Sequence, residues 1–203
     1  EKDQVLSAKV LRLANSPFYG FPSRIASVAH AVVVLGLNVV KGLTLCATAF
    51  DMMRNAGMNE LWRHSLGVAM TAHILGTKAA MKNPEEVFVA GLLHDIGKVV
   101  LYVKWPDVGQ QITTVTRNTS RPLMDAEQEL FEVTHADVGG WLASAWHLPT
   151  SLREPILHHH TPAAAQDAKL QTAIVHVADV LVKGLACGNP GDDLVPPLSR
   201  QAW

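Results

Sequence analysis

The 203-residue sequence contains only two cysteines, few charged residues and no long hydrophobic run. Cys46 and Cys187 lie far apart among apolar neighbours, which favours reduced core thiols over a disulfide framework or a zinc ribbon. The longest nearly continuous apolar stretches, such as residues 31–37, are much shorter than the roughly 18 residues of a membrane span. The first residues are polar and unlike a signal peptide, so we expect a cytoplasmic protein without a membrane partner.

The chain also has no excess of positive or negative charge. Charged residues make up 17% of the chain, the formal net charge is -1, and no run of lysine or arginine alternates with aromatic residues. This pattern argues against duplex nucleic acid as a partner. Hydrophobic residues reach 48%, enough for one sizeable core or two small cores in close contact. Because the chain does not begin with Met and starts directly with helical spacing, we expect a fragment of a longer protein.

Helix-length segments separated by short Gly, Pro or polar signals predict an all-α fold. Pro17 ends the first segment, and residues 20–23 are expected to form a loop. Residues 25–36 and 38–54 fit two apolar helices, although the stretch "AVVVLGLNVV" is rich enough in β-branched residues to form a strand.

The second half of the chain continues this helical pattern. Residues 59–81 fit a long helix, and the next helix, which starts after Asn83, delivers "GLLHDIGK" at residues 91–98. "SLRE" at residues 151–154 is a capping-box pattern that would start the helix with three histidines. Residues 170–185 fit a last helix, followed by a tail.

The ten histidines are notable for their acidic neighbours. Glu60 and His64 are four residues apart, so they share one face of a helix, and His176 and Asp179 are three apart. Asp179 lies within the apolar stretch "AIVHVADVLV". A carboxylate buried there must be paired, hydrogen-bonded or bound to a cation, because an isolated buried charge is very costly.

Five motifs occur in an order that resembles the HD superfamily of metal-dependent phosphohydrolases: "WRHS" (62–65), "GLLHDIGK" (91–98), "THADVG" (134–139), "HHTP" (159–162) and "HVAD" (176–179). In addition, "VLRLANSPFYG" (10–20) and "IASVAHAVVVLGLNVVKGL" (25–43) resemble the N-terminal half of an HDOD domain, the signalling relative of the HD and HD-GYP families. The resemblance implies an all-α, HD-like helical bundle with an additional N-terminal helical bundle. It also implies boundaries at 1–57 and 58–188, with a tail at 189–203.

The resemblance further implies a site for one or more divalent metal ions. The residues that match ligand positions of the superfamily are Glu60, His64, His94, Asp95, His135, His159, His160 and Asp179. The register of the last histidine pair is open, because His158 could replace one of its members. Imidazole and carboxylate ligands without cysteine suit Fe, Mn, Zn or Ni, in a mononuclear or binuclear site.

The resemblance also implies catalytic roles for Asp95 and Lys98. Asp95 would bridge two ions, which would lower the pKa of a shared water toward neutrality, and Lys98 matches a lysine near the substrate phosphate. However, the chain continues after the histidine pair as "TPAAAQDAKL", where an HD-GYP phosphodiesterase has a Gly-Tyr-Pro loop. We therefore expect a bacterial signal-transduction module that acts through signalling proteins or attached regulatory domains. The alternative is an active phosphohydrolase on a nucleotide or other phosphoester ligand.

Overall fold

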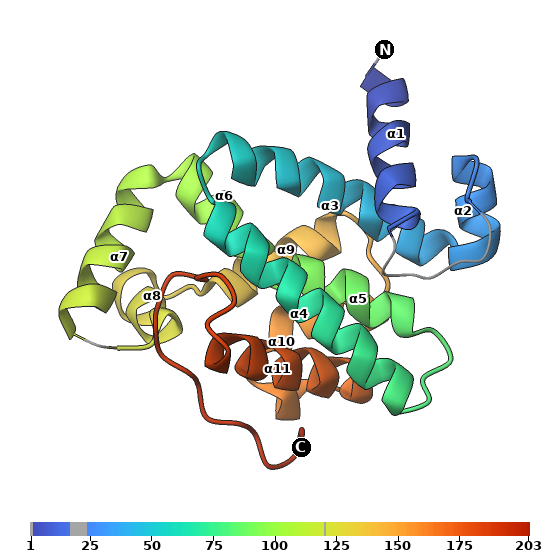
Figure 1. Ribbon diagram of the computed structural model, residues 1–203. Helices are drawn as coiled ribbons and strands as arrows, with labels where there is room; N and C mark the ends of the chain where they lie inside the picture. Colours follow the sequence, from blue (N-terminus) through green and yellow to red (C-terminus); the bar gives the residue numbers. More distant parts are fainter. Residues whose placement is uncertain (1, 17–23, 120) are drawn as a thin grey trace.

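A computed structural model describes residues 2–16, 24–119 and 121–203, and every regular element in these ranges is helical. The predicted all-α class is therefore confirmed, and the strand alternative for residues 31–40 is wrong. Figure 1 shows the helices gathered around α4 and α5. The α-helices are α1 (Lys2–Ala14), α2 (Val28–Leu35), α3 (Leu37–Asn55), α4 (Asn59–Lys78), α5 (Pro84–Leu93), α6 (Ile96–Lys104), α7 (Pro106–Thr119), α8 (Leu123–Phe131), α9 (His135–Ala145), α10 (Thr150–His158) and α11 (Lys169–Gly184).

The N-terminal part consists of α1, α2 and α3. The side chain of Ser27 caps α2 by accepting a hydrogen bond from the backbone N–H of His30. Gly36 separates α2 from α3 with a φ of 85°, a conformation that glycine adopts without steric cost. These two helices confirm the expected pair at residues 25–36 and 38–54 to within three residues at each end. The loop expected at residues 20–23 lies outside the described residues.

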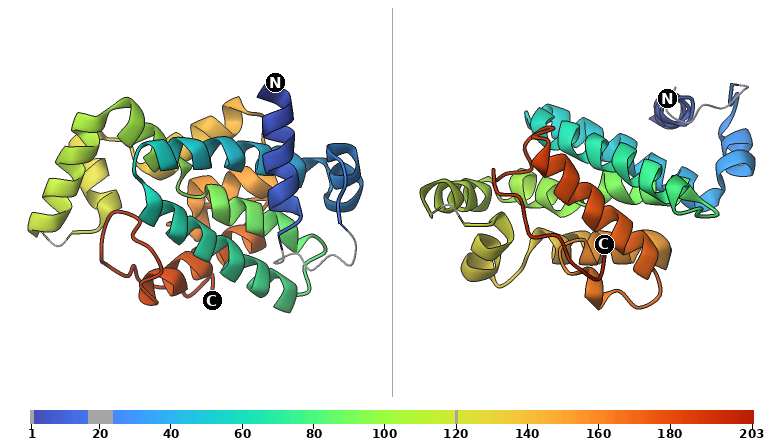
Figure 2. Two further views of the ribbon diagram at one scale, coloured as in Figure 1. Left: turned by 45° about the horizontal axis from the view of Figure 1, so that its top comes forward. Right: turned by 60° about the horizontal axis from the view of Figure 1, so that its bottom comes forward.

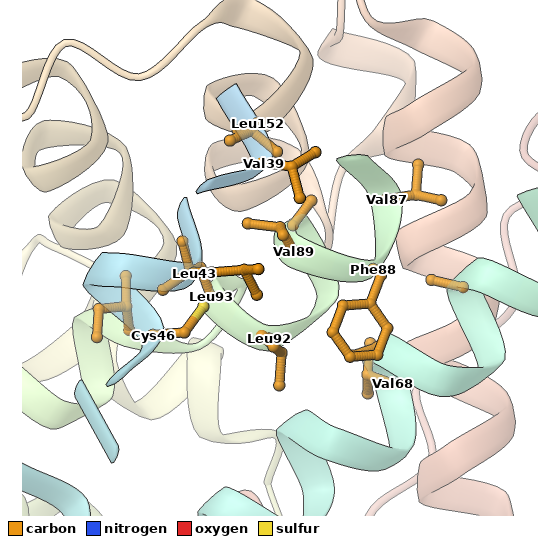
Figure 3. Close-up of a cluster of buried hydrophobic side chains, with 14 of the residues drawn as sticks. Val39, Leu43, Cys46, Val68, Val87, Phe88, Val89, Leu92, Leu93 and Leu152 are labelled. Atoms are coloured by element: carbon orange, nitrogen blue, oxygen red, sulfur yellow. The ribbon is translucent and has the colours of Figure 1, made fainter. Parts of the chain in front are cut away.

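The hydrophobic core lies between α3, α4, α5 and α11, and Figure 3 shows part of it. Every residue of α5 from Val87 to Leu93 is buried. A Cβ placed on Gly91 would lie 2.8 Å from the Cα of Ala69, so only glycine allows α5 to approach α4 this closely. One continuous core includes residues of α1 and α3 as well as the later helices, so the N-terminal part is packed directly onto the rest.

The segment "GLLHDIGK" forms two helices where the sequence predicted one. α5 ends at Leu93, α6 begins at Ile96, and His94 and Asp95 occupy the turn between them. Gly97 explains the close packing that follows, because a Cβ at this position would lie 1.9 Å from the carbonyl oxygen of His135 in α9. The turn therefore places both side chains of the pair in the centre of the bundle.

The predicted capping box at residues 151–154 does not form. α10 begins at Thr150 after Pro149, and no side chain caps it. The carboxylate of Glu154 instead accepts hydrogen bonds from the backbone N–H groups of residues 166–168, just before α11. The pattern was misleading because these N–H groups, which precede another helix, compete for the same carboxylate.

The two remaining parts lie at the periphery. α7 and α8 form an arm at one end of the molecule, and residues 189–203 form a tail without helix that runs back along the bundle (Figures 1 and 2). Among the described residues, no helix combines the length and hydropathy that crossing a bilayer requires.

Candidate metal centre

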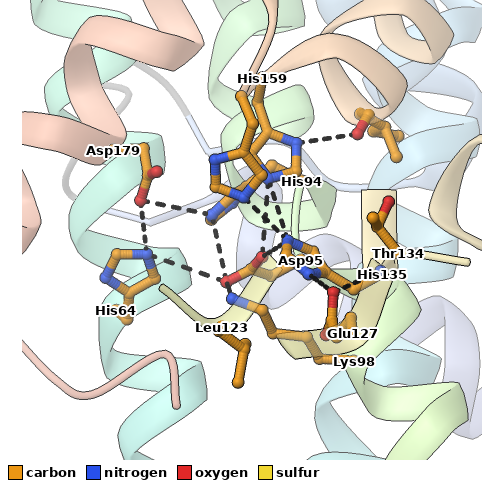
Figure 4. A network of polar contacts seen from close by, with 12 residues as sticks. His64, His94, Asp95, Lys98, Leu123, Glu127, Thr134, His135, His159 and Asp179 are labelled. Atoms are coloured by element: carbon orange, nitrogen blue, oxygen red, sulfur yellow. Dashed lines mark hydrogen bonds and ion pairs between the residues drawn. The ribbon is translucent and has the colours of Figure 1, made fainter. Parts of the chain in front are cut away.

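Seven histidine and aspartate side chains from three helices and two turns converge in the middle of the bundle (Figure 4). All seven were predicted as metal ligands from the sequence, although they span residues 64 to 179. Three overlapping groups place one potential ligand atom of each member within 4.8 Å of the others. The groups are His64, His94 and Asp179; His94, Asp95 and His159; and His135, His159 and His160.

The first group, called the His64 half-site, combines α4, the α5–α6 turn and α11. The Nε2 atom of His64 lies 2.9 Å from Oδ1 of Asp179, and Nε2 of His94 lies 3.8 Å from the same oxygen. Asp179 is thus paired inside its apolar helix, as expected for a buried carboxylate.

The third group, called the His135 half-site, combines the start of α9 with the turn after α10. The Nε2 atom of His135 lies 3.4 Å from Nε2 of His159 and 3.0 Å from Nε2 of His160. The structure places His159 and His160 together in this group, and His158 is not a member of any of the three groups among the described residues.

Asp95 joins the two half-sites through its two carboxylate oxygens. Oδ2 lies 3.3 Å from Nε2 of His94, on the side of the His64 half-site. Oδ1 lies 3.3 Å from Nε2 of His135, on the opposite side. A carboxylate with one oxygen on each side can bridge two cations.

Three of the histidines have their orientation fixed by hydrogen bonds from Nδ1. His94 donates to the carbonyl oxygen of Gly91 at 2.7 Å, and His159 donates to that of Ile156 at 2.9 Å. Nδ1 of His135 lies 2.6 Å from the carboxylate of Glu127. With the proton on Nδ1, the lone pair of each Nε2 points into the cluster, as in metal-ligating histidines.

Unpaired buried atoms at the centre fit a bound cation. Nε2 of His94 and Oδ1 of Asp95 are buried and form no hydrogen bond within the part of the chain that the structure describes, although buried polar atoms are normally satisfied. Nitrogen and oxygen donors without sulfur suit Fe, Mn, Zn or Ni. The chemistry of the donors and their unpaired state together are compatible with a divalent metal.

The pKa shifts of His159 and Asp95 favour the protonation states that metal ligands need, whereas for His94 the adjacent Asp95 carboxylate outweighs burial and raises the pKa. Burial lowers the pKa of His159 well below 6.5, and the neighbouring His160 lowers it further. Burial alone would raise the pKa of Asp95, but His94 and Lys98 together hold it well below its usual value. A neutral imidazole and an ionised carboxylate are the states that bind metal.

Lys98 is buried and lies beside Asp95. Its Nζ donates a hydrogen bond of 2.8 Å to Oδ2 of Asp95, and this ion pair outweighs burial and raises the pKa of the lysine. The lysine is therefore in the cluster, as predicted, but its ammonium group is occupied by the same carboxylate that joins the two half-sites.

Glu60 is the one predicted ligand that the structure does not bring to the cluster. Its side chain is exposed, and its carboxylate accepts a hydrogen bond from Arg63 at 3.1 Å. Although Glu60 and His64 are one helical turn apart, Glu60 lies in the first turn of α4, where its side chain turns toward solvent and Arg63. In the described conformation, Glu60 does not act as a ligand.

Two residues that were not predicted as ligands support the cluster from outside. Glu127 is fully buried and accepts hydrogen bonds from both Nδ1 and the backbone N–H of His135. His176 donates from Nδ1 to the carbonyl oxygen of His159 at 2.7 Å. The sequence around Glu127 did not indicate its supporting role. The spacing of His176 from Asp179, in contrast, did single out His176.

Comparison with known proteins decides the family. The model of the HDOD domain family matches residues 1–162, about four fifths of the chain. The chain belongs to the HDOD family. A solved HDOD domain protein of unknown function from Geobacter sulfurreducens is 32% identical, with a TM-score of 0.74, over 97% of this chain and 68% of that protein's chain. The HDOD signature and the additional N-terminal helices expected from the sequence are thereby confirmed.

Two further relatives extend this result. A predicted phosphohydrolase from Shewanella amazonensis is 25% identical, with a TM-score of 0.69, over 91% of this chain and 66% of that one. An uncharacterised protein of Treponema pallidum is 25% identical over 199 residues. The match covers 95% of the present chain but only 38% of the length of that relative. Asp179 and the C-terminal tail lie beyond the residues that the family model matches.

Proposed function

We propose that this HDOD chain is a bacterial signal-transduction module built around a centre for two divalent metal ions. The observation that carries the proposal is the position of Asp95, which has one carboxylate oxygen 3.3 Å from Nε2 of His94 in one half-site and the other 3.3 Å from Nε2 of His135 in the opposite half-site. His64, His94 and Asp179 would hold one ion, and His135, His159 and His160 the other. When bound, such a pair supplies Lewis-acid polarisation and concentrated positive charge.

The closed surroundings of the centre support a regulatory rather than a catalytic role. Six of the seven proposed ligands are 0–2% exposed, and only His160 is half-buried. His160 lines a pocket of about 390 Å³, and the acidic residues Asp125 and Asp137 line it too. Among the described residues around this pocket there is no lysine or arginine, so an anionic phosphoester would meet negative charge on its way to the centre.

The N-terminal helices offer a surface for the protein partners that this proposal requires. α2 is strongly apolar, but Ala31 is its only buried residue within the described helix. Val33 is 83% exposed, and Leu37 at the start of α3 is 66% exposed. Exposed apolar groups on adjacent helices are typical of contact surfaces for other proteins or attached domains.

A second candidate function is metal-dependent hydrolysis of a nucleotide or another phosphoester. The seven clustered ligands and the buried cation Lys98 favour it, because Lys98 could stabilise negative charge on a phosphoryl group once released from Asp95. The absence of the Gly-Tyr-Pro loop and the acidic pocket at His160 count against it.

One experiment separates the two candidates. The protein is loaded with Fe²⁺ or Mn²⁺, its metal content is measured, and bis(p-nitrophenyl) phosphate and cyclic dinucleotides are tested as substrates. Bound metal without turnover is the expected result. Turnover that disappears in Asp95→Ala would overturn the regulatory proposal and establish the hydrolase. Absence of bound metal would overturn both candidates.

A further inference from the structure

We infer that the C-terminal tail, residues 189–203, is a strap that holds the two half-sites in register, and that Asp192 is its main positioning residue. This inference rests on the proposed metal centre. The tail contacts α4, α8 and α11, which are the helices that carry or support metal ligands on both sides of the cluster.

Asp192 connects α8 with α11 through its two carboxylate oxygens. Its Oδ2 accepts a hydrogen bond of 2.8 Å from the backbone N–H of Leu123, the first residue of α8. Its Oδ1 accepts one of 2.6 Å from Nζ of Lys183, in the last turn of α11. The side chain of Asp192 is only 5% exposed, so solvent screens these interactions weakly.

The contact with Leu123 replaces a missing helix cap. α8 follows Pro122 and has no side-chain cap of its own, so Asp192 supplies the acceptor from 69 residues away. A carboxylate at this end of a helix also interacts favourably with the helix dipole. One turn after Leu123, the same helix presents Glu127, which holds His135. Asp192 therefore holds the start of the helix whose Glu127 supports the His135 half-site.

The contact with Lys183 reaches the opposite half-site. Lys183 lies one helical turn after Asp179 in α11, so the two side chains project from the same face of the helix. By engaging the ammonium group of Lys183, Asp192 ties the helix that supplies Asp179 to the helix that supports His135. The distance between the half-sites depends on this link.

The tail makes two further contacts near ligands. The backbone N–H of Ser199 donates to Nε2 of His176 at 3.0 Å, and His176 in turn holds the carbonyl oxygen of His159. At the other end of the tail, the N–H of Asn189 donates to the carbonyl oxygen of Glu60 at 3.3 Å. Just before it, Gly188 lies so close to α4 that an added Cβ would be 2.4 Å from the backbone N of His64.

The tail also closes one side of the molecule. Residues 189–194 line a cavity of about 770 Å³, together with the start of α4 and residues of α6 and α7. Gly191 lies against Leu123, since an added Cβ would be 3.2 Å from Cδ2 of that leucine. Displacement of the strap would therefore loosen α8 and open this side of the bundle. A small chelator could then reach the metal from this side.

The test compares Asp192→Ala with Asp193→Ala in the protein loaded with Co²⁺. Asp193 is an exposed neighbour whose carboxylate accepts only from Asn189 in the described structure, so it is a matched control. We expect Asp192→Ala to accelerate the removal of Co²⁺ by EDTA by about 10-fold, as for loss of other groups that support ligands, and to change the visible spectrum of Co²⁺. Asp193→Ala should leave both unchanged.

The outcomes are distinct. A parent protein that binds no Co²⁺ would overturn the proposed metal centre and the strap together. A loaded parent with unchanged release rate and spectrum in a folded Asp192→Ala variant would overturn the strap alone. If Asp192→Ala does not fold, Lys183→Gln weakens the same link and keeps the α8 cap, and it should accelerate release to a smaller extent. No acceleration in Lys183→Gln would then contradict the inference.

Discussion

Glu127 accepts two hydrogen bonds from His135, one from Nδ1 at 2.6 Å and one from the backbone N–H at 2.9 Å. The carboxylate therefore fixes both the start of α9 and the imidazole ring. We predict that Glu127→Gln weakens metal binding at the His135 half-site about 10-fold or more, because an amide cannot match the charged acceptor that orients the ring. Metal titration by calorimetry measures the effect.

The control for this variant is Glu129→Gln. Glu129 lies in the same helix, but it is exposed and paired with Arg121. The Glu129→Gln variant should bind metal with the affinity of the parent protein. Equal affinity in Glu127→Gln and the parent would show that His135 does not need its carboxylate partner for metal binding.

Gly97 permits the contact between α6 and α9 that places His135 next to Asp95. An added methyl group would lie 1.9 Å from the carbonyl oxygen of His135 and 2.9 Å from the backbone N of Gly139, and backbone cannot move aside as a side chain can. We predict that Gly97→Ala lowers the free energy of unfolding by about 3 kcal/mol or more. Urea denaturation followed by circular dichroism measures this change.

Gly184→Ala is the matched substitution in open space, because nothing lies within 4 Å of a Cβ added there. Its effect should stay within about 0.5 kcal/mol of the parent. A similar small effect for Gly97→Ala would mean that the two helices can separate without cost.

The lowered pKa of Glu154 predicts that the stability of the protein depends on pH. Burial would raise its pKa, but the backbone N–H groups of Ala168, Asp167 and Gln166 outweigh burial and lower the pKa below 4.5. The unfolded chain thus binds a proton at a higher pH than the folded chain. The stabilisation is complete above pH 4.5 and is lost as the pH falls through the lower pKa of the folded state.

Glu154→Gln should remove this dependence and lower the free energy of unfolding at neutral pH by about 1–3 kcal/mol. Urea denaturation of both proteins from pH 7 to pH 3 tests it, with the exposed Glu132→Gln as control. Parallel stability curves for the parent and Glu154→Gln over this range would contradict the assignment.

Removal of metal should lower the melting temperature. Ions that bind only the folded state stabilise it, by about 2.7 kcal/mol at a concentration 100-fold above the dissociation constant. We expect EDTA to lower the melting temperature of the loaded protein in a thermal scan and to leave that of Asp95→Ala unchanged. An identical shift in both proteins would indicate an effect of the chelator that does not involve the centre.

The sequence was most informative where the local pattern determines the structure. Helical spacing and Gly or Pro signals predicted the helices, and the ordered motifs predicted the convergence of seven side chains, from His64 to Asp179. The break at His94 and Asp95 was not predicted, because the segment "GLLHDIGKVVLY" is apolar on both sides of the turn. Its close packing depends on contacts of Gly91 and Gly97 with distant helices.

Residues whose role depends on tertiary contacts were missed. Nothing in "MDAEQELF" distinguishes the buried Glu127 from the exposed Glu129, because the helix position against α9 decides which carboxylate is buried. Asp192 lies in a segment that looked like a plain tail. Glu60 shows the opposite case, since its spacing from His64 suggested a ligand while its position in the first turn of α4 directs it to Arg63.

The central claim is that Asp95 joins two half-sites that bind a pair of divalent ions. The most direct measurement is the metal content per chain after anaerobic loading with Fe²⁺ or Mn²⁺ and desalting, determined by inductively coupled plasma mass spectrometry. The account predicts a pair of ions in the parent protein and in Glu60→Gln, and loss of both in a folded Asp95→Ala variant. A parent protein without bound metal, or an Asp95→Ala variant that retains the pair, would contradict it.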